Sequence, residues 1–194
     1  MRKSYSFPEA LQHAILSGLD LLPIAFLVLD ENAKTLIANR AARRIVPNVQ
    51  ARQLNRIFRE LIATWKKSGK GAPATRTVER SSGRPLSILA VPVNCQEPVL
   101  AGDPASVVFL SDPDLDCSAD PTLLSKLFGF TPAEANVAAL MMRGNTVEEI
   151  GEKLRISPHT ARNHLKRLFS KTNTKRQGEL VHMLMSSPAC LDFN

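Results

Sequence analysis

The spacing of apolar residues changes along the chain, and the change falls near residue 112. Short apolar runs before that point are typical of strands, and they occupy 24–30, 35–39, 75–79, 86–93 and 106–110. Residues 8–17 and 39–46 are predicted to form short helices. A longer amphipathic core helix is predicted from one stripe of apolar side chains: Leu54, Ile57, Phe58, Leu61, Ile62 and Trp65. The order of two strands, helices and three strands predicts an α+β domain over residues 1–112.

After residue 121 the apolar spacing is helical throughout, and the helix boundaries have local signals. Thr131-Pro132-Ala133-Glu134 and Thr146-Val147-Glu148-Glu149 are capping boxes, each predicting a helix start. Gly144 predicts the end of the first helix, and Ser157-Pro158 the start of a third. A fourth helix is expected from about residue 175 to 185, with a lead-in turn at 122–128. The pattern predicts a four-helix domain over residues 122–187 and a tail at 188–194.

Between the two domains, residues 113–121 are acidic, contain two prolines and show no periodicity, which predicts a linker.

The third helix has two different faces. Ala161, Leu165, Leu168 and Phe169 form a core stripe, whereas His159, Arg162, Asn163 and Lys166 fall on another side. Six Lys or Arg and no Asp or Glu lie between residues 157 and 177. Arginine and lysine suit guanine edges or phosphates, and asparagine suits adenine. A solvated basic face on an ordinary bundle is the plain alternative. The two capped helices, the short turn and the acid-free third helix together favour a helix-turn-helix that binds double-stranded DNA.

Residues 130–185 resemble the LuxR/NarL/GerE-type helix-turn-helix domain of bacterial transcription regulators. The resemblance rests on the joint spacing of Phe130-Thr131-Pro132, Glu134, Gly144, Glu149-Ile150, Leu154, Ile156-Ser157, Thr160, His164, Lys171 and Arg176. It implies a third helix in the major groove and a homodimer, often formed through the fourth helix. The resemblance leaves open whether RNA polymerase is a further partner. Gly151 and Ala161 depart from the alanine and valine usual in the family, and a mid-helix glycine should loosen the second helix by about 0.5–1 kcal/mol.

Carried over by position, Arg162, Asn163 and Lys166 would face the groove, and Thr160 and Lys171 would contact the DNA backbone. Arg167 and His159, from the same basic helix, complete the candidate DNA-binding set.

The start of the N-terminal domain resembles a PAS domain. The resemblance rests on residues 22–30 followed by residues 36–42, where a proline precedes the first strand and Asn39 starts a helix. It implies a PAS-like antiparallel sheet with helices and a sensory or dimerising role. No His or Met lies between Asp20 and Asp112, so a haem ligated from within the domain is not expected. No cofactor is predicted; a small apolar or weakly polar ligand and no ligand both remain open. A phosphorylated receiver domain is the weaker alternative, because no acceptor aspartate stands in the expected place.

The net charge of +7 and the pI near 9.7 suggest a polyanionic partner, but the charge is unevenly distributed. Residues 34–84 hold thirteen basic and two acidic residues, a balance of +11, whereas residues 120–194 hold ten and seven, a balance of +3. The DNA-binding prediction therefore rests on charge focused on one helix. The upstream excess is interpreted as a solubilising face, and non-specific contact with DNA is the alternative.

Other function classes are disfavoured. No apolar stretch is long enough to span a membrane, and Cys95, Cys117 and Cys190 have no metal-ligand spacing, so a cytoplasmic protein with reduced thiols and no metal is expected. The chain shows no nucleophile motif or phosphate loop that would indicate an enzyme. RNA binding is disfavoured because the module lacks an aromatic stacking surface. A protein-interaction adaptor that does not bind DNA is the main alternative.

Overall fold

The computed structural model describes residues 8–48, 51–68, 72–80, 82–93, 103–114 and 119–192. The chain divides into two compact units, Met1–Leu115 and Asp116–Asn194. Cys95, Cys117 and residues 115–118 of the predicted linker lie outside the described residues.

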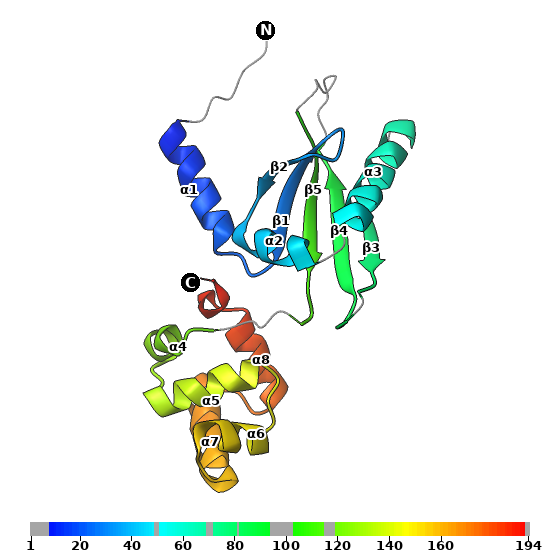
Figure 1. Cartoon of the computed structure of the whole chain (residues 1–194). Coiled ribbons are helices and arrows are strands. Elements are labelled where there is room, and N and C mark those ends of the chain that lie inside the picture. The colour runs from blue at the N-terminus through cyan, green and yellow to red at the C-terminus, as the bar shows by residue number, and fades with distance from the viewer. Residues whose placement is uncertain are drawn as a thin grey trace. The chain divides into compact units, whose positions relative to one another are not determined.

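The N-terminal unit is built on one five-stranded antiparallel sheet with the strand order β2-β1-β5-β4-β3 (Figure 1). Its strands are β1 (Ala25–Asp30), β2 (Thr35–Ala38), β3 (Ala74–Val78), β4 (Leu86–Pro92) and β5 (Pro104–Ser111). Its helices are α1 (Glu9–Asp20), α2 (Arg40–Ile45), the 3₁₀ turn η1 (Val46–Asn48) and α3 (Ala51–Ser68). This order confirms the prediction of an α+β domain with an antiparallel sheet and helices.

One face of the sheet and the apolar stripe of α3 form the N-terminal core. Side chains alternate along β4, with Leu86, Ile88 and Ala90 buried and Ser87 and Leu89 exposed. The buried partners from α3 are Leu54, Phe58, Leu61 and Ile62, with Ile57 and Trp65 packed against them. The prediction of an amphipathic core helix is therefore confirmed.

Buried polar side chains hold the first strands in place. The Asn39 side chain accepts hydrogen bonds from the backbone N–H groups of Ala42 and Phe26, at 2.9 Å each, which caps α2 and ties it to β1. Its amide donates to the carbonyls of Leu19 and Ile24 at 3.0 and 2.9 Å. These bonds tie the start of α2 to β1 and to the end of α1.

A cluster of ion pairs joins the β3–β4 connection to the residues that follow β5. Arg80 pairs with Asp112 at 2.8 Å and with Asp114 at 2.7 Å, and Arg84 pairs with Asp114 at 2.7 Å. The Arg80 and Asp112 side chains are only 12% and 10% exposed. Asp112 and Asp114 are thus anchored to the β3–β4 connection. The hydrogen bond from Arg84 lowers the pKa of Asp114.

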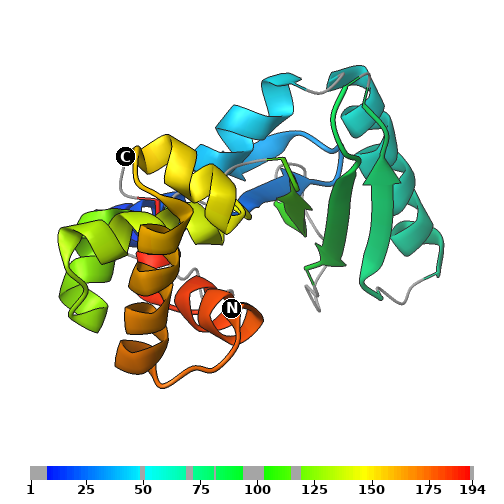
Figure 2. The ribbon, with the colours of Figure 1, turned by 90° about the horizontal axis from the view of Figure 1, so that it is seen from below.

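The C-terminal unit consists of α4 (Pro121–Phe128), α5 (Pro132–Met142), α6 (Val147–Leu154), α7 (Pro158–Thr172), α8 (Gln177–Met185) and the 3₁₀ turn η2 (Pro188–Cys190), seen from below in Figure 2. Each helix start predicted from a cap is present. Fully buried side chains come from every helix, among them Leu124, Met141, Ile150, Leu168 and Leu184. This unit therefore has a hydrophobic core of its own.

Two details differ from the sequence expectations. α1 continues to Asp20 instead of ending near Ser17, and none of its residues is buried. In the segment expected to be a tail, Ala189 is fully buried against the helical core, and the Cys190 thiol lies 3.8 Å from the Leu184 carbonyl. The segment after Pro188 therefore packs on the helical unit.

Candidate DNA interface

Local signals set both ends of α7. The Ser157 hydroxyl accepts a hydrogen bond from the Thr160 backbone N–H at 3.0 Å and lies 2.8 Å from the Thr160 hydroxyl. Pro158 occupies the first turn, where its missing N–H costs nothing. Asn173 ends the helix in the left-handed conformation, with φ of 53°. The helix that carries the candidate residues is therefore firmly bounded.

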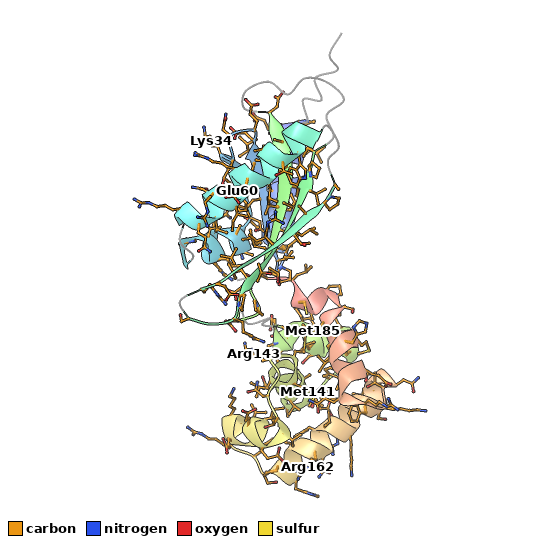
Figure 3. The ribbon with its side chains drawn as sticks, turned by 90° about the vertical axis from the view of Figure 1, so that its right-hand side faces the viewer. Lys34, Glu60, Met141, Arg143, Arg162 and Met185 are labelled. Carbon is orange, nitrogen blue, oxygen red and sulfur yellow. The ribbon has the colours of Figure 1, made fainter. Side chains whose placement is uncertain are left out.

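The predicted two faces of α7 are present. Ala161 and Leu168 are buried, and Leu165 and Phe169 pack against the same core. The side chains exposed on α7 include five of the candidates: His159, Arg162, Asn163, Lys166 and Arg167. In Figure 3, Arg162 projects outward at the edge of the helical unit, whereas Met141 lies inside it. The apolar stripe thus fixes α7 in the core and leaves its basic side accessible.

A tight turn joins α6 to α7. Thr146 and Glu149 form the expected capping box at the start of α6, with bonds of 2.7 and 3.2 Å. Arg155 then adopts φ of 56°, and the Ile156 N–H donates to the Gly151 carbonyl at 2.9 Å. A Cβ at buried Gly151 would lie 3.0 Å from the Ile156 carbonyl oxygen. Gly151 therefore allows this close approach of the turn to α6.

Arg162 does not extend into solvent alone. Its guanidinium contacts the Glu148 carboxylate of α6 at 2.6 Å, while the two side chains stay 55% and 60% exposed. Sequence reasoning did not identify this partner, because the two residues are fourteen positions apart and lie on different helices. Glu148 is thus an exposed acidic side chain in contact with one of the candidate DNA-binding residues.

Lys171 contacts the start of α5. Its ammonium donates to the Glu134 carboxylate at 2.8 Å and to the Gly129 carbonyl at 2.7 Å. Glu134 is 2% exposed in its side chain and also accepts the Thr131 N–H at 2.9 Å. Burial raises the pKa of Glu134, but the hydrogen bonds from Lys171 and Thr131 outweigh it and lower the pKa below its ordinary value. Lys171 therefore neutralises a buried charge.

The remaining candidates differ in what they contact. Thr160 is half-buried, with its hydroxyl near Ser157. His159, Asn163, Lys166 and Arg167 make no hydrogen bond or ion pair through their side chains to the described part of the chain. Donors and acceptors on these four exposed side chains are thus available to an external partner.

His164, which follows Asn163, lies partly inside the domain. Its Nδ1 atom is buried and has no hydrogen-bond partner among the described residues. His164 therefore differs from the exposed candidates on the same helix.

Two further observations concern other kinds of site. No helix in the described ranges is both long and apolar enough to cross a membrane. The same residues include no group of three or more His, Cys, Asp or Glu side chains arranged to hold a metal ion.

Comparison with known families agrees with this geometry. Residues 129–184 match the family described as bacterial regulatory proteins, luxR family. The match covers α5 to α8, including both capping boxes and the exposed side of α7. The C-terminal unit is therefore a LuxR-type helix-turn-helix DNA-binding domain. No curated protein matches the chain significantly.

Solved structures with a similar outline are distant. The phage VqmA–DPO complex is 16% identical, with 92% of this chain and 89% of that chain covered and a TM-score of 0.40. The Vibrio cholerae VqmA dimer without target DNA is also 16% identical, covers 90% and 86%, and has a TM-score of 0.39. A PAS domain from Colwellia psychrerythraea is 12% identical, covers 54% and 97%, and has a TM-score of 0.35.

Proposed function

We propose that this chain is a transcription regulator that binds specific sequences of double-stranded DNA through α7. The observation that carries the proposal is the structure of α7 itself, which buries one stripe and exposes a basic, hydrogen-bonding face within a LuxR-type domain. An α-helix is about 10–12 Å across with its side chains, and the major groove is about 12 Å wide. The exposed face of α7 can therefore enter the groove while its apolar stripe stays in the core.

Each candidate residue has a role that suits its chemistry. Arg162, Asn163 and Lys166 are proposed to meet base edges, because arginine and lysine pair with guanine and asparagine with adenine. Thr160, at the start of α7, is proposed to contact a phosphate. Lys171 has two donors engaged by protein and a third that can reach a phosphate. His159 and Arg167 are proposed to flank this set.

The regulator is proposed to act as a homodimer. α8 lies at the end of the domain and exposes Met185, with 47% of its surface accessible. Two α7 helices related by two-fold symmetry would read half-sites about 34–36 Å apart. The expected operator is therefore a palindrome.

The N-terminal unit is proposed to modulate DNA binding. It has its own sheet and core, and it joins the helical unit near Leu115. A comparison of the full chain with residues 116–194 in the same binding assay tests this role. Equal affinity and equal half-site spacing for the two proteins would contradict it.

Selection of duplexes from a random pool tests the proposed function. The wild-type chain should enrich a two-fold symmetric sequence, and the Arg162→Ala/Lys166→Ala variant should lose that enrichment while keeping its fold. A Lys126→Ala/Arg143→Ala variant is the matched control, because it removes two exposed positive charges from α4 and the end of α5. The control should enrich the same sequence as the wild type.

A protein-interaction adaptor predicts a different result. Neither the full chain nor residues 116–194 would then enrich any sequence, although both are folded. Equal losses in the variant and in the charge-matched control would mean that α7 supplies only general positive charge. Either result would overturn the proposed function.

A further inference from the structure

The contact between Glu148 and Arg162 joins the first and second helices of the helix-turn-helix on its exposed side. Glu148 lies in the first turn of α6, and Arg162 lies one turn into α7. The carboxylate oxygen and the guanidinium nitrogen are 2.6 Å apart, and each side chain is more than half exposed. The pair therefore sits where the DNA is proposed to bind.

The ion pair between Glu148 and Arg162 contributes little to the stability of the fold. An exposed ion pair contributes about 0–1 kcal/mol and is screened by salt. The start of α6 is already held by Thr146 and Glu149, and α7 is held by the Ser157 cap and its buried stripe. Removal of the Glu148 carboxylate should leave the fold intact.

The pair changes what Arg162 can reach. A guanidinium has five N–H donors, and Glu148 engages one of its terminal nitrogens. The other donors have no partner among the described residues, so they remain available. A side chain held at one end loses conformers, and bidentate recognition of a base needs a guanidinium in one defined plane.

The negative charge of Glu148 also affects whether Arg162 contacts phosphates or base edges. A free arginine binds any nearby phosphate, and phosphate contacts carry no sequence information. The Glu148 carboxylate repels phosphates and occupies the side of Arg162 that faces α6. Contact with phosphates is thereby disfavoured relative to contact with base edges, and specificity is the difference between the two affinities.

We infer that Glu148 is a positioning residue for DNA recognition, which holds Arg162 toward base edges and away from phosphates. This inference rests on the proposed function, since it requires that the exposed side of α7 binds DNA. Glu148 itself need not touch the DNA.

The test uses the full chain, the duplex selected by the wild type, and a scrambled duplex of the same composition. Glu148→Ala should bind the scrambled duplex more tightly and lower the ratio of specific to scrambled affinity by about tenfold, within the range of one base contact. The slope of log affinity against log salt on the scrambled duplex should steepen by about 0.9, because Arg162 gains one phosphate contact. Glu148→Asp, which keeps the charge on a shorter side chain, should restore part of the ratio.

Two controls separate positioning from net charge. Glu152→Ala removes the same charge from an exposed site on α6 that has no ion pair within the described residues, and it should leave the specificity ratio within about twofold. In an Arg162→Ala background, Glu148→Ala should no longer change the ratio. Equal effects of Glu148→Ala and Glu152→Ala, or a full effect without Arg162, would overturn the inference.

Failure of the role inferred for Glu148 can be distinguished from failure of the proposed function. A wild-type chain that prefers no duplex would refute DNA recognition itself. A wild-type chain that prefers its duplex, loses that preference in Arg162→Ala and keeps it in Glu148→Ala would refute only the role of Glu148.

Discussion

Replacing Lys171 by methionine should destabilise the helical unit while keeping most of the side-chain volume. The ammonium of Lys171 is the positive charge that contacts the Glu134 carboxylate, which is 2% exposed. Breaking a buried pair by removing one partner costs about 3–5 kcal/mol. Water can reach part of this site because Lys171 is 35% exposed, and Glu134 keeps its bond from the Thr131 N–H. We therefore expect a loss of about 2–3 kcal/mol in the free energy of unfolding.

Scanning calorimetry of the full chain measures this loss. Trp65 is the single tryptophan and lies in α3, so its fluorescence identifies the transition of the N-terminal unit. The other transition belongs to the helical unit, and its midpoint should fall by about 10–20 °C in Lys171→Met. Lys166→Met, on the same helix and exposed, is the matched control and should change stability by less than about 0.5 kcal/mol.

The dependence on pH gives a second measurement with a defined sign. The folded-state pKa of Glu134 lies below its ordinary value of 4.5, so the ionised carboxylate stabilises the fold above that pH. This contribution is lost as the pH falls through the folded pKa. The difference in stability between the wild type and Lys171→Met should therefore shrink below about pH 4.5.

A double-mutant cycle with Glu134→Gln decides whether the two side chains act together. Their coupling energy should exceed about 1 kcal/mol. Unchanged stability in Lys171→Met, or additive losses in the double variant, would refute the argument that Lys171 neutralises Glu134. A DNA-binding salt slope lowered by about 0.9 would show a phosphate contact in addition.

Three further predictions concern single backbone or side-chain positions. Gly83→Ala should lower the stability of the N-terminal unit by about 2 kcal/mol, because φ of Gly83 is 86° and a Cβ there would lie 2.4 Å from Asp114. Urea unfolding followed by Trp65 fluorescence measures this loss, and an unchanged midpoint would contradict the prediction. Ser106→Ala should raise the free energy of unfolding of the N-terminal unit by about 1 kcal/mol, because the buried Ser106 hydroxyl has no hydrogen-bond partner among the described residues. A loss of stability would show that the hydroxyl has a partner. Arg155→Gly should raise the free energy of unfolding of the helical unit by up to about 1 kcal/mol, because φ of 56° is strained for arginine and not for glycine. The calorimetric midpoint of this unit should rise accordingly. A lower midpoint would mean that the arginine side chain stabilises the turn.

Much of the helical unit could be predicted because its signals are local. A capping box links residues three positions apart, so Thr131 with Glu134 and Thr146 with Glu149 mark helix starts without knowledge of the fold. The buried stripe of α7 follows in the same way from helical spacing. The two faces of the candidate site were therefore predictable from residues 157–172 alone.

The partners of the charged side chains were not predictable. Lys171 contacts Glu134 across 37 positions, and Arg162 contacts Glu148 across 14. In the N-terminal unit, Arg80 meets Asp112 across 32 positions. Each of these three residues has several acids in the sequence that it could meet, and no spacing rule selects one.

The sequence by itself determined where the capped helices begin, which side of each is apolar, and which helix has a basic face. These properties depend on backbone conformation and on bonds within one or two turns. Only the tertiary structure decided that β1 lies between β2 and β5, that Lys171 neutralises a buried carboxylate, and that Glu148 holds Arg162. Ion pairs and strand neighbours depend on distance in space, and that distance is set only when the whole core has packed.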